Sequence, residues 1–146
     1  MSGQLSLGYL YDSSFDDPKK PRDDFGSLRL SVQSADFFGR TAFWVQWQDV
    51  REFADDLVAY TASSVAVFSR QWGYNLHEGD DLIIRLQFDR LAKDEYILTA
   101  ELADGHQPED RVLTRFKTNS QAVLWFVRDV KKVMDRDLAE AILLGV

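Results

Sequence analysis

The chain has 146 residues, 45% of them hydrophobic and 28% charged, which is typical of one globular domain of ordinary size. It has no cysteine, which excludes a disulfide framework, a thiolate metal site and a cysteine nucleophile. Its net charge of −7 disfavours binding to nucleic acid. No apolar run is long enough to span a bilayer, and the first residues lack a secretory pattern, so we expect a cytoplasmic protein without a membrane partner.

The first 27 residues form an N-terminal arm in which Leu5, Leu7 and Tyr9 alternate with smaller or polar residues. This alternation predicts an edge strand that docks on the body of the protein. Residues 28–146 are predicted to form a single domain. It opens with an alternating run over 28–32 and a run rich in aromatic and β-branched residues over 40–47, which together predict an antiparallel hairpin.

Two long helices are predicted from the spacing of apolar residues. Asp49 and Glu52 have the spacing of a capping box, and helical periodicity follows over 50–60. The second helix is predicted over 120–135, with Asn119 or Ser120 as its N-cap. A second capping-box spacing precedes residues 138–144, which we expect to form a short C-terminal helix.

Four strand-like runs separate the two long helices, over 65–72, 81–91, 95–102 and 111–118. The connectors between them are short and rich in turn residues, which favours antiparallel pairing. The predicted fold class is therefore α+β. It is a single domain with an antiparallel sheet of about six or seven strands, packed against two main helices plus a short C-terminal helix.

Residues that could perform catalysis are few. His77 and His106 are the only histidines, and neither belongs to a metal-binding or triad motif. Glu78, Asp80 and Asp81 could offer oxygen ligands to a hard cation, but their spacing does not match a calcium loop. We therefore predict no catalytic residue, no metal and no cofactor.

Two sets of residues combine the features of a partner-binding surface. Aromatic rings anchor protein complexes and carboxylates steer a basic partner toward them. The first set is the loop with Trp72, Tyr74, Glu78, Asp80 and Asp81, and the second is the helix face with Glu52, Asp55 and Asp56. We favour the loop because the helix face offers no ring. The alternative is that Trp72 and Tyr74 plug the end of the sheet, and their exposure distinguishes the two readings.

The order of elements resembles that of the WapI-type bacterial immunity proteins. The resemblance extends from about residue 28 to 134 and includes Phe38-Gly-Arg-Thr-Ala-Phe-Trp44, the helix at 50–57 and the closing helix at 122–134. It implies a non-enzymatic protein that binds and neutralises a toxin domain, often a nuclease with a basic surface. Two alternatives stay open, which are a small-molecule-binding or scaffolding domain and a hydrolase-like enzyme that uses the loop at 72–81.

Overall fold

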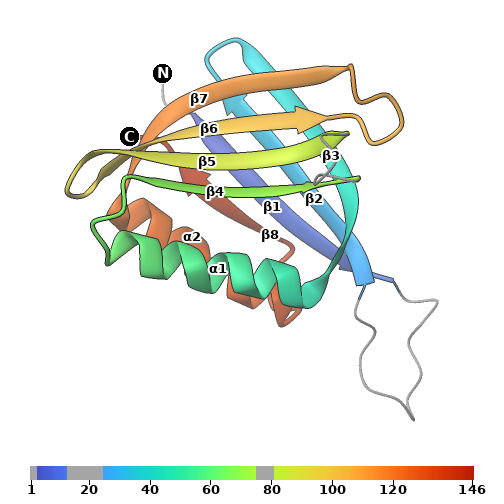
Figure 1. The fold of residues 1–146 in the computed structure, drawn as a ribbon. Helices are drawn as coiled ribbons and strands as arrows, with labels where there is room; N and C mark the ends of the chain where they lie inside the picture. The colour runs from blue at the N-terminus through green and yellow to red at the C-terminus, as the bar shows by residue number, and fades with distance from the viewer. Residues whose placement is uncertain (1–2, 13–24, 75–80) are drawn as a thin grey trace.

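The computed structural model describes residues 3–12, 25–74 and 81–146. In this part of the chain, eight strands form two four-stranded antiparallel sheets (Figure 1). Sheet A has the order β3-β2-β1-β8, and sheet B has the order β4-β5-β6-β7. The elements are β1 (Gln4–Tyr11), β2 (Phe25–Ser34), β3 (Phe37–Gln46), α1 (Trp47–Thr61), β4 (Val67–Gly73), β5 (Leu82–Ala92), β6 (Glu95–Ala103), β7 (Arg111–Asn119), α2 (Ser120–Met134) and β8 (Glu140–Leu144).

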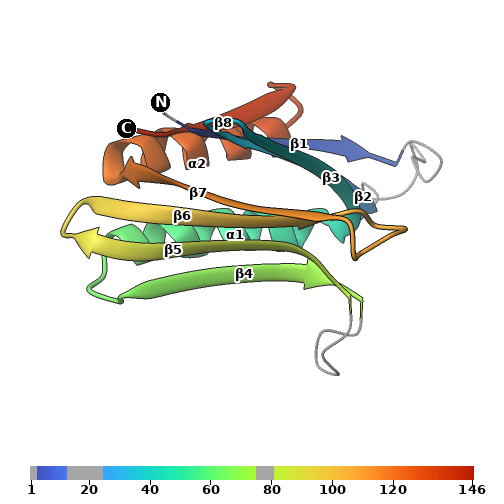
Figure 2. The same ribbon diagram turned by 90° about the horizontal axis from the view of Figure 1, so that it is seen from above.

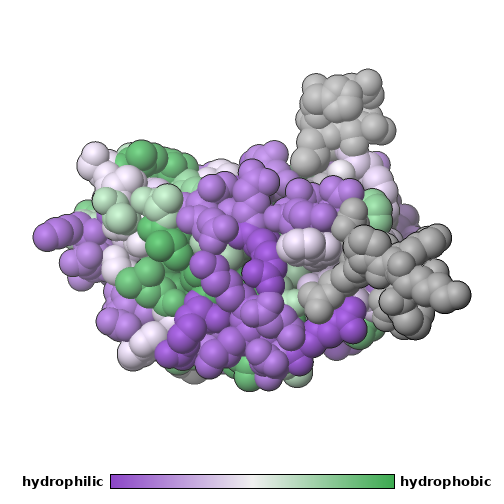
Figure 3. Space-filling view, turned by 90° about the horizontal axis from the view of Figure 1, so that it is seen from below, coloured by the Kyte–Doolittle hydropathy of each residue, from purple (hydrophilic) through white to green (hydrophobic). Residues whose placement is uncertain are grey.

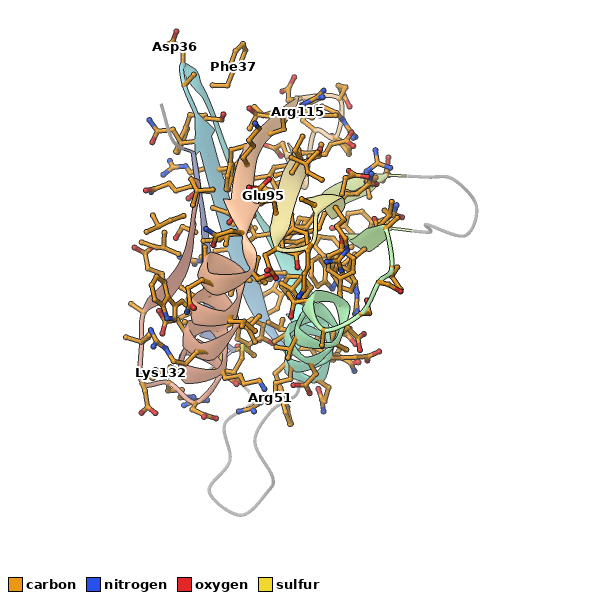
Figure 4. The ribbon with its side chains drawn as sticks, turned by 90° about the vertical axis from the view of Figure 1, so that its left-hand side faces the viewer. Asp36, Phe37, Arg51, Glu95, Arg115 and Lys132 are labelled. Atoms are coloured by element: carbon orange, nitrogen blue, oxygen red, sulfur yellow. The ribbon has the colours of Figure 1, made fainter. Side chains whose placement is uncertain are left out.

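The two sheets lie at an angle to each other, and the two helices pack side by side across the open side between them (Figure 4). Seen from above, both helices lie behind the strands (Figure 2). Side-chain hydrogen bonds join the sheets, because Ser34 Oγ donates to the carbonyl of Arg115 at 2.8 Å and Thr41 Oγ1 donates to that of Ala103 at 2.5 Å. The α+β class and the antiparallel strands predicted from the sequence are confirmed.

The core is the space enclosed by both sheets and the helix layer. Each strand contributes the residues of one face, as the alternation of apolar and polar side chains requires. Helix α1 contributes Phe53 and Leu57, and helix α2 contributes Phe126 and Val130, all fully buried. Rings contact one another across elements: the Phe53 ring lies 5.7 Å from the ring of Trp72 and 6.2 Å from that of Phe68.

The C-terminal segment differs from its prediction, because residues 140–144 form strand β8 and not a helix. Ala141 and Leu143 are buried, whereas Ile142 and Leu144 are exposed, so the segment has the period of a strand. A short apolar run fits both periods, and pairing with β1 decides between them here. The predicted short helix was wrong, as was the prediction of one sheet with six or seven strands.

Strand β8 also changes the place of the N-terminal arm. Strand β1 pairs with β2 on one side and with β8 on the other, so it lies inside sheet A and not at its edge. Leu5 and Leu7 are fully buried, and the Tyr9 hydroxyl donates to the carbonyl of Val45 at 2.6 Å. The alternation in the arm was read correctly, whereas its edge position was wrong.

The two long helices lie where the sequence predicts them, but their N-termini differ in capping. Helix α1 begins at Trp47, and its N-cap Gln46 makes no side-chain capping bond, so the predicted capping box at Asp49 and Glu52 was wrong. Helix α2 is capped as predicted, because the Asn119 side chain accepts a hydrogen bond from the Ala122 N–H at 2.8 Å. Neither helix has the length and apolar character that crossing a bilayer requires.

Candidate protein-binding surface

The loop after β4 presents one of its two predicted rings to solvent. Trp72 is only 7% exposed and packs against Phe53, so it belongs to the core and offers no surface to a partner. Tyr74 is 49% exposed, its ring meets that of Phe43 edge-on at 5.0 Å, and its N–H donates to the carbonyl of Asp81 at 3.1 Å. His77, Glu78 and Asp80 lie outside the described residues.

A depression of about 320 Å³ lies beside this loop, where the ends of β3 and β4 meet the first turn of α1. Phe25, Phe43 and Trp44 line it, together with Asp49 of α1 and the last residues of β4. Trp44 is 57% exposed on the outer side of the edge strand β3. We call Phe25, Phe43, Trp44 and Tyr74 the aromatic rim.

The acids of helix α1 fall into two groups. Asp49, Glu52 and Asp56 are spaced so that they share one side of the helix. Asp49 lines the depression and Asp56 pairs with Arg70 of β4 at 2.5 Å, so this side runs along β4. Asp55 instead pairs with Lys131 of α2 at 3.0 Å. The structure thus brings Glu52 and Asp56 to the same side of the molecule as Tyr74, whereas Asp55 faces the other helix.

Two ion pairs link the two helices. Besides the pair of Asp55 and Lys131, Arg51 of α1 binds Asp135 at the end of α2. Seen from the helix side, the surface is mostly hydrophilic, with an apolar area toward the end where α1 finishes and α2 begins (Figure 3). Glu52 has no ion pair or side-chain hydrogen bond among the described residues, so its negative charge is available to a partner.

Sequence reasoning named Tyr74 but missed Phe25, Phe43 and Trp44 of the aromatic rim, and it placed Trp72 on the surface although a signal for its burial was present. On β4, Phe68, Arg70 and Trp72 alternate with Ser69 and Gln71. This pattern places Trp72 on the inner face. The contact between β3, the end of β4 and the start of α1 is tertiary, and nothing in the local sequence indicates it.

Among the described residues, no group of three or more His, Asp or Glu side chains is placed to hold a metal ion. His106 is exposed in the loop after β6, where its backbone N–H donates to the carboxylate of Asp104 at 2.7 Å. The most buried acid is Glu101, whose carboxylate accepts from Arg85 at 2.5 Å and from Arg111 at 2.6 Å. Both of its oxygens are thus occupied by structural ion pairs.

The Glu101 cluster makes the stability of the protein depend on pH. Burial raises the pKa of this carboxyl, but the hydrogen bonds from Arg111 and Arg85 outweigh burial and lower the pKa below its ordinary value of 4.5. Because the pKa of Glu101 is lower in the folded state than in the unfolded state, the ionised carboxylate stabilises the fold at any pH above the unfolded-state pKa. This stabilisation is lost as the pH falls through the folded-state pKa.

We therefore expect Glu101→Gln to lower the free energy of unfolding by about 2 kcal/mol at pH 7. Urea denaturation measured from pH 7 to pH 2 should show this difference shrink below pH 4.5, as the wild-type carboxyl takes up its proton. A difference that stays constant over this range would contradict the role of the ionised carboxylate.

Comparison with known proteins gives no match, either to a family model or to a curated protein. What the chain does must therefore be inferred from the chemistry of its surface.

Proposed function

We propose that this chain is a non-enzymatic, immunity-like protein that binds and neutralises a basic toxin domain, with the aromatic rim and the neighbouring carboxylates as its contact surface. The observation that carries the proposal is that the exposed rings of Trp44 and Tyr74 lie beside the acidic side of helix α1. The resemblance of the element order to WapI-type immunity proteins supports the same function.

The two kinds of side chain have different roles in such a complex. Exposed aromatic rings beside a depression supply the buried centre of an interface, where a few residues carry most of the binding energy. Carboxylates without internal partners attract a positively charged partner and accelerate its approach. Glu52 is such a carboxylate within the part of the chain that the structure describes, and the net charge of −7 adds to its effect.

A nuclease is a suitable target for this surface. A nuclease binds its substrate through the phosphate backbone, so its active face must carry lysines and arginines. An acidic protein that docks on that face competes directly with the nucleic acid. Neutralisation then needs no chemistry from the bound protein.

The test starts from the neighbouring genes, where the proposal requires a toxin gene, and the toxin domain encoded there is then co-expressed with this chain. Cells that produce the toxin domain should survive only when the chain is also present, and the purified proteins should form a complex. Survival without the chain, or death despite it, would refute the immunity function.

Variants then test the surface within that complex. We expect Tyr74→Ala to weaken binding about tenfold, which is about 1.4 kcal/mol. Glu52→Lys should slow association several-fold at low salt and by less at high salt, because added ions screen exposed charges.

Matched controls come from other parts of the surface. Phe37 and Glu95 are both exposed (Figure 4). Phe37 begins β3 seven residues before Trp44, and Glu95 pairs with Ala92 at the opposite end of β5 from the Gly73–Leu82 pair, so both lie far from the rim. Phe37→Ala and Glu95→Lys should leave the dissociation constant and the association rate unchanged. Equal effects from controls and rim variants would reject the rim as the contact surface.

A further inference from the structure

The outer face of sheet A is turned away from the helices and from sheet B, and no described element covers it (Figure 4). Two depressions of about 510 and 580 Å³ open on this side. Both are lined by Gly8, Arg29 and Ala139, so they join into one hollow, which we call the sheet groove. It begins at β3, crosses β2 and β1, and reaches the segment between α2 and β8.

The floor of the sheet groove is built from small side chains on one face of the sheet. The register places Ser6 opposite Ser31, and Gly8 opposite Arg29. On β3, Ala42 lies opposite Arg29. Since Ser6, Ser31, Gly8 and Ala42 carry a hydroxymethyl group, a methyl group or no side chain, the face is hollow around Arg29.

Apolar side chains rise on both sides of this floor. At one end of the floor, Ser27 of β2 pairs with Leu10 of β1 on one side and with Trp44 of β3 on the other, and both of these apolar side chains are exposed. At the opposite end of the groove floor, Gln33 of β2 pairs with Gln4 of β1. The exposed Phe38 of β3 lies opposite Gln33, and the exposed Leu144 of β8 lies opposite Gln4. The groove therefore has apolar walls and a polar floor.

Two arginines lie on this floor, one on β2 and one on β3. Arg29 and Arg40 are exposed, and neither makes an ion pair or a side-chain hydrogen bond among the described residues. Arg70 and Arg111, by contrast, each bind a carboxylate. Two acids from the described part of the chain line the groove. Glu140 of β8 accepts a hydrogen bond from Ser6 Oγ at 2.6 Å, and Asp137 lies at the end nearest α2, next to Arg136.

The arginines are spaced to match an extended chain. Arg29 lies opposite Ala42, and Arg40 lies opposite Ser31, so the two arginines are diagonal neighbours on adjacent strands. Their β-carbons are thus about 7 Å apart. In an extended peptide, side chains two residues apart share one face and are separated by about 6.6 Å. Two carboxylates in that arrangement reach one guanidinium each, with the bidentate geometry that arginine favours.

We propose that the sheet groove binds an extended acidic segment of a protein partner, with two carboxylates spaced two residues apart on Arg29 and Arg40. The Ser31 hydroxyl is placed to donate to the peptide backbone, whereas the Ser6 hydroxyl already donates to Glu140. The apolar walls contact the side chains that flank the two acids on the same face of the peptide. This site shares the Trp44 ring with the proposed toxin contact, but Arg29 and Arg40 lie outside that contact and carry the opposite charge. Nucleic acid is a poorer occupant because the net charge of −7 repels a long polyanion.

The probe is a fluorescein-labelled octapeptide in which aspartate alternates with valine, measured by fluorescence anisotropy with the full chain. Binding should be lost when asparagine replaces aspartate, and it should be weaker when the aspartates stand in adjacent pairs. Arg29→Gln and Arg40→Gln should each weaken binding about tenfold. Arg115→Gln is the matched control, because Arg115 is exposed on the outer face of sheet B and has no side-chain partner among the described residues (Figure 4).

Several outcomes would overturn the proposal. These are equal binding of the asparagine peptide, no binding of the aspartate peptide, or an equal loss in Arg115→Gln. Displacement of the peptide by millimolar inorganic phosphate would identify a site for small anions instead. Tyr74→Ala and Glu52→Lys should leave peptide binding unchanged, so the groove and the toxin contact can fail separately.

Discussion

Replacing Phe53 by alanine is expected to lower the free energy of unfolding by about 4 kcal/mol. Phe53 is fully buried, and its ring packs between helix α1 and strand β4, against Trp72 and Phe68. Truncation removes apolar contacts and leaves a cavity. The cavity cannot collapse easily, because Trp72 is fixed in a paired strand and α1 is held by its ion pairs to α2 and β4.

Urea denaturation at 25 °C measures this loss. The control is Phe37→Ala, which removes the same ring from a site that is 65% exposed and should change the free energy of unfolding by less than about 0.5 kcal/mol. A loss under 2 kcal/mol for Phe53→Ala would contradict the packing of α1 against sheet B.

Gly26→Ala is expected to destabilise the protein by about 3 kcal/mol, although it adds a single methyl group. A β-carbon at this position would lie 2.5 Å from the Tyr9 ring and 2.6 Å from the carbonyl oxygen of Leu10. Neither neighbour can move freely. The Tyr9 ring is held by the hydrogen bond from its hydroxyl to Val45, and the Leu10 carbonyl belongs to the backbone of a strand inside sheet A.

Thermal unfolding should show this effect as a fall in Tm of about 9 °C for a domain of this size. Gly105→Ala is the control, because a β-carbon at that position would lie 3.6 Å from the Ala42 carbonyl oxygen, an ordinary van der Waals distance and the nearest approach among the described residues. Unchanged stability of Gly26→Ala would mean that β1 and β2 do not approach as closely as the structure shows.

Local periodicity was sufficient for most elements of this fold. Apolar spacing located α1 and α2, and alternation located the four strands of sheet B, because in each case one face is buried and the other is exposed. Asn119 was one of two predicted caps, because either of two adjacent short polar side chains before an apolar helical pattern can cap it, and only the structure distinguishes Asn119 from Ser120.

The division into two sheets and the binding surfaces could not be predicted in this way. Both depend on which strands pair over long distances, and a single sequence does not report pairing. Trp44 illustrates the difficulty, since its alternation assigns it to one face of β3 but does not reveal that this face is uncovered. The pairing of Arg29 and Arg40 across β2 and β3 likewise becomes visible only with the register.

The placement of β1 between β2 and β8 has a consequence for the rate of folding. Sheet B is built from strands that follow one another along the chain, so its hairpins close short loops. Sheet A is complete only when β8 reaches β1, a contact that joins Ser6 to Glu140, 134 residues away. Closing such a loop has a large entropic cost, which slows folding. Until β8 arrives, the backbone edge of β1 remains open, and during that interval a second chain can pair with it and begin aggregation.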